Sequence, residues 1–226
     1  MIRANIYNLE PLDKKTRESV NTGIEMVAAF MGHTVVSQEC RLRISTDVLG
    51  RVDPRRVGFG KMDRLVELHL LAVPLSPILH KDLVGLAGAG RGWAFVDVAP
   101  PTTNQQASIR STTAHEVAHA LGYVRPGAHQ EDPADYGHCS DPDCILHKNI
   151  IGVPAGDRRH PGERFLIRAK RTAKAVMGDL GLAPQSTRVG YQYDFCLPCK
   201  VDFREHGDEH LSSIRANRVI YNHSIQ

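Results

Sequence analysis

The stretch "TAHEVAHALG" (113–122) places two histidines four residues apart, with a glutamate directly after the first. On a helix, residues four apart project from one face one turn apart, so His115 and His119 can grip a single metal ion. Glu116 lies one position further round the helix, within reach of a water on that metal. The stretch therefore predicts a helix that carries part of a zinc hydrolase site.

A catalytic zinc site needs a third protein ligand, and the position where many zinc peptidases place it holds Arg125. Further along, "GHCSDPDCILH" (137–147) offers His138 directly before Cys139. Three other candidates precede this stretch: His129, Asp132 and Asp135. We prefer His138, because the cysteine beside it can anchor its backbone to a second metal site.

Four of the five cysteines form two close pairs, Cys139 with Cys144 and Cys196 with Cys199. Four thiolates satisfy the tetrahedral coordination of zinc. In a reducing compartment, paired cysteines are more often metal ligands or core residues than disulfides. The pairing therefore favours a second metal site, with four reduced core residues as the alternative.

Together these motifs resemble the archaemetzincins, a family of zinc metallopeptidases in the metzincin clan. The resemblance rests on "HEVAHALG", the His-Cys pair, the cysteine after four more residues and the later Cys-x-x-Cys. It implies two zinc ions per chain and hydrolysis of a peptide or protein substrate by a zinc-activated water. It implies these roles: His115, His119 and His138 on the catalytic zinc, Glu116 as general base, and Cys139, Cys144, Cys196 and Cys199 on a structural zinc.

The resemblance also implies the fold class, α/β (α+β). We expect a metzincin-like domain, in which a twisted mixed sheet packs on the active-site helix and a C-terminal helical part follows. Residues 1–226 would form a single domain, with a sheet and helix part to about 122 and a zinc-stabilised part over about 123–226. The strand at 93–99 would be the edge strand that holds an extended peptide by backbone hydrogen bonds.

Apolar periodicity and turn residues locate the other elements. We expect helices at 11–31, about 105–121, 161–181 and about 198–219. We expect strands at 33–44, 64–73 and 93–99, with the Gly-rich stretch "GLAGAGRG" as a loop before the last. Residues 123–160 have little periodicity and should be ordered but irregular.

Three features depart from the pattern of the family. About a dozen residues are inserted between Gly122 and His138. Leu146 replaces an expected methionine, and because leucine fills a similar volume we expect the packing to survive. The segment between the two cysteine pairs is long and includes the basic helix 161–181, interpreted as a solvated face. These departures motivate an alternative function, a zinc-stabilised binding or regulatory protein without catalysis.

Composition excludes several other classes of function. The 226 residues carry a net charge of only +3, so we do not expect a nucleic-acid partner. The sequence has no apolar stretch of membrane-spanning length and no signal peptide at its N-terminus. The default expectation is a cytoplasmic monomer that does not enter a membrane.

Overall fold

A computed structural model of the chain describes residues 1–57, 66–75, 85–99, 105–122, 137–141, 144–147 and 194–223. Within these residues the chain forms a five-stranded mixed sheet of order β2-β1-β3-β5-β4. The strands are β1 (Ile2–Asn8), β2 (Val35–Arg41), β3 (Leu68–Val73), β4 (Gly85–Gly88) and β5 (Trp93–Asp97). Four of them run parallel, and β4 lies antiparallel to β5 at one edge.

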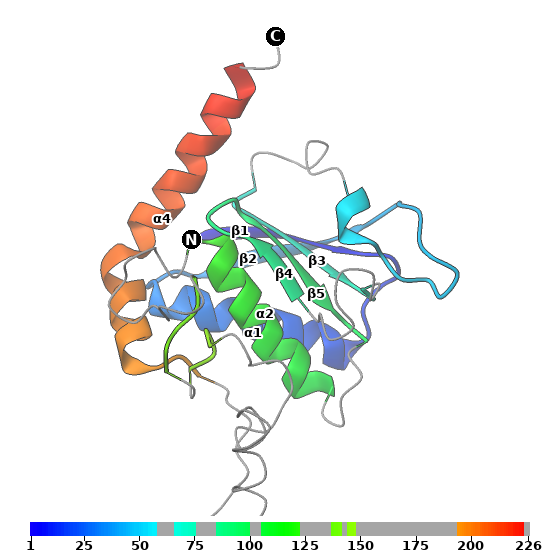
Figure 1. Cartoon of the computed structure of the whole chain (residues 1–226), viewed down its shortest axis with the longest axis horizontal. Helices are drawn as coiled ribbons and strands as arrows, with labels where there is room; N and C mark the ends of the chain where they lie inside the picture. Colours follow the sequence, from blue (N-terminus) through cyan, green and yellow to red (C-terminus); the bar gives the residue numbers. More distant parts are fainter. Residues whose placement is uncertain are drawn as a thin grey trace, which may run out of the picture.

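Helices α1 (Lys14–Phe30) and α2 (Gln105–Ala120) cover one face of this sheet (Figure 1). The short helix η1 (Pro54–Arg56) belongs to the chain segment that follows β2. Helix α4 (Leu197–His223) contacts α1, and its C-terminal half extends away from the sheet (Figure 1). None of the helices in the described ranges is long and apolar enough to cross a bilayer.

Helix α1 begins and ends at residues suited to those places. The Asp13 carboxylate caps the first turn by accepting hydrogen bonds from the backbone N–H groups of Lys15 and Thr16, at 3.0 and 3.1 Å. At the other end Gly32 adopts a left-handed φ of 68°, which glycine does without strain. Hydrogen bonds from Thr16, first from its side chain and then from its backbone N–H, hold the pKa of Asp13 below its usual value.

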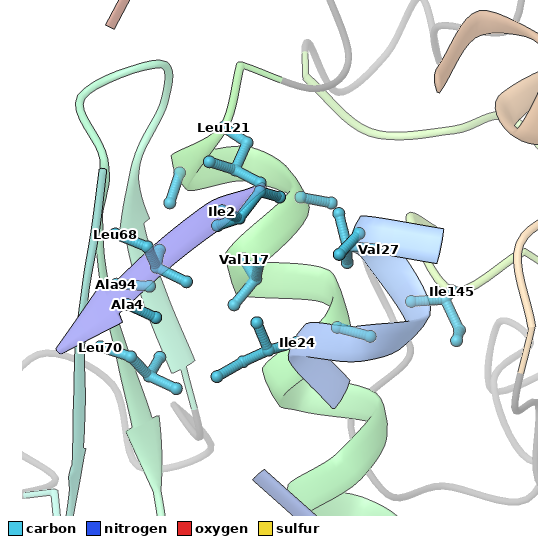
Figure 2. Close-up of a cluster of buried hydrophobic side chains, with 14 of the residues drawn as sticks. Ile2, Ala4, Ile24, Val27, Leu68, Leu70, Ala94, Val117, Leu121 and Ile145 are labelled. Atoms are coloured by element: carbon cyan, nitrogen blue, oxygen red, sulfur yellow. The ribbon is translucent and has the colours of Figure 1, made fainter. Parts of the chain in front are cut away.

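The main hydrophobic core lies between the sheet and the two helices. Figure 2 shows side chains of β1, β3 and β5 pointing toward Val117 of α2, Leu121 just after it, and Ile24 and Val27 of α1. The strand residues share the pleat face that points to the helices: Ile2, Ala4, Leu68, Leu70 and Ala94. A smaller cluster on the opposite face of the sheet includes Val52, Leu71 and Phe95. Strands β3 and β5 are therefore buried on both faces, whereas β2 is largely exposed.

Helix α2 is buried on nearly every side and carries polar residues into the interior. Its buried polar side chains are Ser108, Ser111, Thr112, Thr113, His115 and Glu116. Burying so many polar groups is unfavourable unless each has a partner, so such a helix indicates a functional site. The close approach of α1 to α2 is made possible by Gly23, since a Cβ there would lie 2.6 Å from the Thr113 Cβ.

The C-terminal end of α2 is capped by the turn between β4 and β5. The backbone N–H groups of Gly90 and Gly92 donate to the carbonyls of His119 and Ala120, both at 2.9 Å. These carbonyls belong to the last turn of the helix and lack partners within it. Gly122 ends the helix with a φ of 97°, as the sequence predicts.

Most elements predicted from the sequence are confirmed, with ends shifted by a few residues. The helix expected at 11–31 is α1, that at 105–121 is α2, and that at 198–219 is α4. The strands expected at 33–44, 64–73 and 93–99 are β2, β3 and β5. The helix at 161–181 lies outside the described residues. The fold class, a mixed α/β sheet packed on α2, is confirmed.

Two expectations about the sheet are wrong. The stretch "GLAGAGRG" is not only a loop, because its first four residues form β4. Strand β5 is not the edge strand, because β4 pairs with it on the outer side and β3 on the inner side. The edge strand beside α2 is β4. The N-terminal strand β1 was not expected at all, although it occupies an interior position in the sheet.

We predict that Gly23→Ala lowers the free energy of unfolding by about 1 to 3 kcal/mol, because the new methyl group overlaps Thr113 and the Arg110 carbonyl. Gly207→Ala on α4 is the matched control. Its methyl group would meet only the flexible Met31 side chain, at 3.0 Å or more. Urea denaturation of both variants measures the difference, and equal effects would contradict the tight helix crossing.

Candidate metal centre

Three histidine rings converge where the last turns of α2 meet the segment 137–141. The Nε2 atoms of His115 and His119 are 3.1 Å apart. The ring centroid of His138 lies 5.4 Å from that of His115 and 4.9 Å from that of His119. One ring nitrogen from each histidine lies within 4.8 Å of the other two. The structure thus brings the three histidines singled out in the sequence to one place.

This arrangement suits a zinc ion. Tetrahedral zinc with Zn–N bonds of about 2.0 to 2.1 Å separates neighbouring nitrogen ligands by about 3.4 Å. The 3.1 Å between the two Nε2 atoms on α2 is close to that value. Three imidazoles also match the donor set of known catalytic zinc sites, which keep one position open.

The tautomer of His115 is fixed by a hydrogen bond. Its Nδ1 lies 2.6 Å from the Ile145 carbonyl oxygen. Because a carbonyl only accepts, Nδ1 carries the proton and Nε2 keeps the lone pair that a metal requires. Burial, and then the nearby His119, lower the pKa of His115 well below its usual value. The ring is therefore neutral and ready to bind a cation at neutral pH.

The four paired cysteines form a second cluster beside the first. The Sγ atoms of Cys139 and Cys196 are 3.7 Å apart, as are those of Cys144 and Cys199. A disulfide needs about 2.05 Å, whereas tetrahedral zinc with Zn–S bonds of about 2.3 Å separates its sulfurs by about 3.8 Å. All four sulfurs lie within 4.8 Å of one another. The donor set fits a four-thiolate zinc ion.

The environment of these sulfurs also suits thiolates. Backbone N–H groups donate to two of them: Asp141 to Cys139 at 3.4 Å, and Leu146 and Cys196 to Cys144 at 3.4 and 3.3 Å. Hydrogen bonds from neighbouring thiols lower the pKa of Cys139 and of Cys196. The same contacts raise the pKa of Cys144 and of Cys199. All four cysteines can therefore be ionised at the same time only with a cation between them.

Glu116 sits in the same buried region and touches the edge strand. Its side chain is only 5% exposed, and burial raises the pKa of its carboxyl to about 8. A cation on the adjacent histidines would favour the ionised form and bring the pKa down. The carboxyl group lies against Gly85 of β4, where a Cβ would come within 2.5 Å of Oε1. Only glycine leaves room for this carboxyl.

Leu146, which replaces the expected methionine, is fully buried in the main core. Its backbone N–H donates to the Cys144 sulfur, and its carbonyl accepts from the Cys139 N–H at 2.9 Å. The expected packing is therefore present. The three alternative third ligands, His129, Asp132 and Asp135, lie outside the described residues.

Sequence reasoning missed two contributors to this centre. The Ile145 carbonyl belongs to the backbone, so no residue type signals it. Gly85 was assigned to a loop, although four glycines within residues 85–92 signal that the backbone closely approaches another element. Both residues act by close backbone contact, which becomes visible only when the elements are placed in space.

The fold is similar to that of solved archaemetzincin structures. The archaemetzincin from Methanopyrus kandleri matches with a TM-score of 0.50 and 16% sequence identity, covering 76% of this chain and 96% of that chain. The sequence itself matches no family model and no curated protein.

The chain has an archaemetzincin-like fold. The match spans nearly the whole of the solved chain. Two further structures resemble this archaemetzincin-like fold at a TM-score of 0.47. They are the archaemetzincin from Archaeoglobus fulgidus, 11% identical over 88% of this chain and 99% of that one, and a zinc-dependent peptidase from Methanocorpusculum labreanum, 17% identical over 89% and 100%.

Proposed function

We propose that this chain is a zinc-dependent metallopeptidase. The observation that carries the proposal is the convergence of His115, His119 and His138 beside the buried carboxyl of Glu116 and next to an edge strand. The three histidines would hold the catalytic zinc. When bound, zinc lowers the pKa of a coordinated water to about 7 and polarises a carbonyl. The archaemetzincin-like fold and the family resemblance of the sequence support the proposal of a zinc-dependent metallopeptidase.

In this proposal Glu116 is the general base. Its carboxylate would accept a proton from the attacking water at Oε1 or Oε2 and deliver that proton to the leaving amine. The contact with Gly85 holds the carboxyl in place, and burial on α2 excludes competing solvent. Burial keeps the His115 ring neutral, and the hydrogen bond to the Ile145 carbonyl places its proton on Nδ1, so Nε2 can remain a ligand throughout.

The substrate would be a peptide or protein in extended form. Strand β4 lies at the edge of the sheet and pairs, within the described residues, only with β5. A peptide can add to such an edge as a further strand through main-chain hydrogen bonds. Because Gly85 of β4 touches Glu116, a peptide bound along β4 would pass beside the general base.

The four cysteines would hold a second, structural zinc that ties α4 to the segment 137–147. We propose that the whole chain acts as one catalytic domain, with two zinc ions and as a monomer. None of the five cysteines is in a disulfide, which is consistent with the reducing conditions of the cytoplasm.

The first test is Glu116→Gln in the zinc-loaded protein. Glutamine keeps the shape of the side chain but cannot accept the proton, so we expect kcat/KM on a peptide library to fall by about 10²- to 10⁴-fold. Zinc content, measured by mass spectrometry of the metal, should stay at two per chain. Unchanged activity would contradict the proposal. Tight peptide binding without cleavage by the native chain would instead favour the non-catalytic alternative.

A second test is Gly85→Ala. The new methyl group would come within 2.5 Å of Glu116 Oε1 and displace the carboxyl from its position against β4. We expect kcat to fall by at least about tenfold while two zinc ions are retained, because misplacing a catalytic group slows the chemical step. Gly207→Ala, on α4, is the control and should keep its activity. Equal kcat values for the two variants would show that the contact with β4 does not position Glu116.

A further inference from the structure

We propose that the four-cysteine site positions the histidine site, so that metal on the thiolates gives the three histidines their affinity for metal. This inference rests on the proposed function, since it assumes that both clusters bind zinc. The inference goes beyond the proposed function because it assigns the cysteine cluster a role in forming the catalytic site, in addition to stabilising the fold.

The first link between the sites is covalent. His138 and Cys139 are neighbours, and Cys139 is fully buried with its sulfur 3.7 Å from that of Cys196. A metal on these sulfurs would fix the Cys139 backbone. The His138 backbone is then fixed as well, which places its ring beside the two histidines of α2.

The second link is the hydrogen bond to His115. Its acceptor is the carbonyl of Ile145, the residue directly after Cys144. Ile145 is held in turn by its N–H, which donates to the Asp194 carbonyl at 3.0 Å, two residues before Cys196. The group that sets the His115 tautomer is therefore anchored on both sides by cysteines of the second cluster.

The third observation is that the two links are joined to each other. The Cys139 N–H donates to the Leu146 carbonyl at 2.9 Å, which closes the stretch between the two cysteines. A metal bound to the four sulfurs, which lie within 4.8 Å of one another, would hold both ends of this stretch in place. Loss of the metal would remove that constraint from His138 and from the Ile145 carbonyl together. The histidine site would then lose the fixed position of its third ring and the acceptor that sets the His115 tautomer.

The test uses Cys196, directly before α4, and Cys199, in its first turn, because both are far in sequence from the histidines. The double variant Cys196→Ala/Cys199→Ala removes half of the second site without changing the segment 137–147. We measure the zinc affinity of the histidine site by chelator competition, with circular dichroism to show that the helices remain. We expect affinity to fall by about tenfold or more, the range seen when partners of metal ligands are lost.

Two matched variants separate metal binding from other effects. Cys196→His can still complete a zinc site, because three cysteines and one histidine form a common structural zinc set. It should restore the affinity of the histidine site to within about threefold of the native value. Cys40→Ser removes the one cysteine that lies outside the cluster and should change nothing. Native affinity in the double variant would overturn the proposal, as would failure of Cys196→His to restore affinity while it still binds zinc.

If the double variant does not fold, Cys40→Ser protein loaded with cobalt tests the same coupling between the two metal sites. An organomercurial titrates the thiolates, and the thiolate-to-cobalt charge-transfer band reports the second site alone. We expect cobalt to leave the histidine site, seen in its visible bands, as the thiolate band disappears. Retention of the histidine-site bands would overturn the proposal. None of these readouts depends on peptidase activity, so failure of the coupling is distinct from failure of the proposed function.

Discussion

The hydrogen bond from His115 Nδ1 to the Ile145 carbonyl is the interaction on which the rest of the site depends. It gives a buried polar ring on α2 its partner, and it selects the tautomer that leaves Nε2 free for a metal. It also joins the sheet-and-helix part of the chain to the segment that carries Cys139 and Cys144. One short contact thus connects the architecture of the domain to both candidate metal sites.

Glycines allow neighbouring segments to approach α2 closely. Gly23 allows α1 to pack against Thr113 of α2, and Gly85 of β4 leaves room for the Glu116 carboxyl. Gly90 and Gly92 donate hydrogen bonds from their N–H groups to the end of the helix. The N–H groups of Gly90 and Gly92 satisfy two carbonyls at the end of the helix, and Gly85 leaves room for a buried carboxyl. The helix that carries the buried polar side chains is therefore in close contact with α1, β4 and β5. A catalytic site requires supporting contacts of this kind.

Local patterns were enough to predict the helices, and the errors arose where the determinant was not local. The spacing of His115 and His119 predicted that these two side chains share one helix face. Their meeting with His138, and the meeting of the two cysteine pairs, followed only from the family resemblance. Strand order depends on pairing between distant segments, so β5 was wrongly predicted to be the edge. Strand β4 is short and begins and ends in glycine, which weakens its signal. The alternation of Ile2, Ala4 and Ile6 in β1 was a usable signal that was overlooked. Zinc binding by the histidine and cysteine clusters stays a prediction.

The most direct measurement is an anomalous diffraction map of the crystallised protein at the zinc absorption edge. The account predicts two peaks per chain. One should lie about 2.0 to 2.1 Å from a ring nitrogen of His115, His119 and His138, and the other about 2.3 Å from the sulfurs of the four cysteines. A single peak at the cysteines, or a peak at α2 whose third ligand is His129, Asp132 or Asp135, would contradict it.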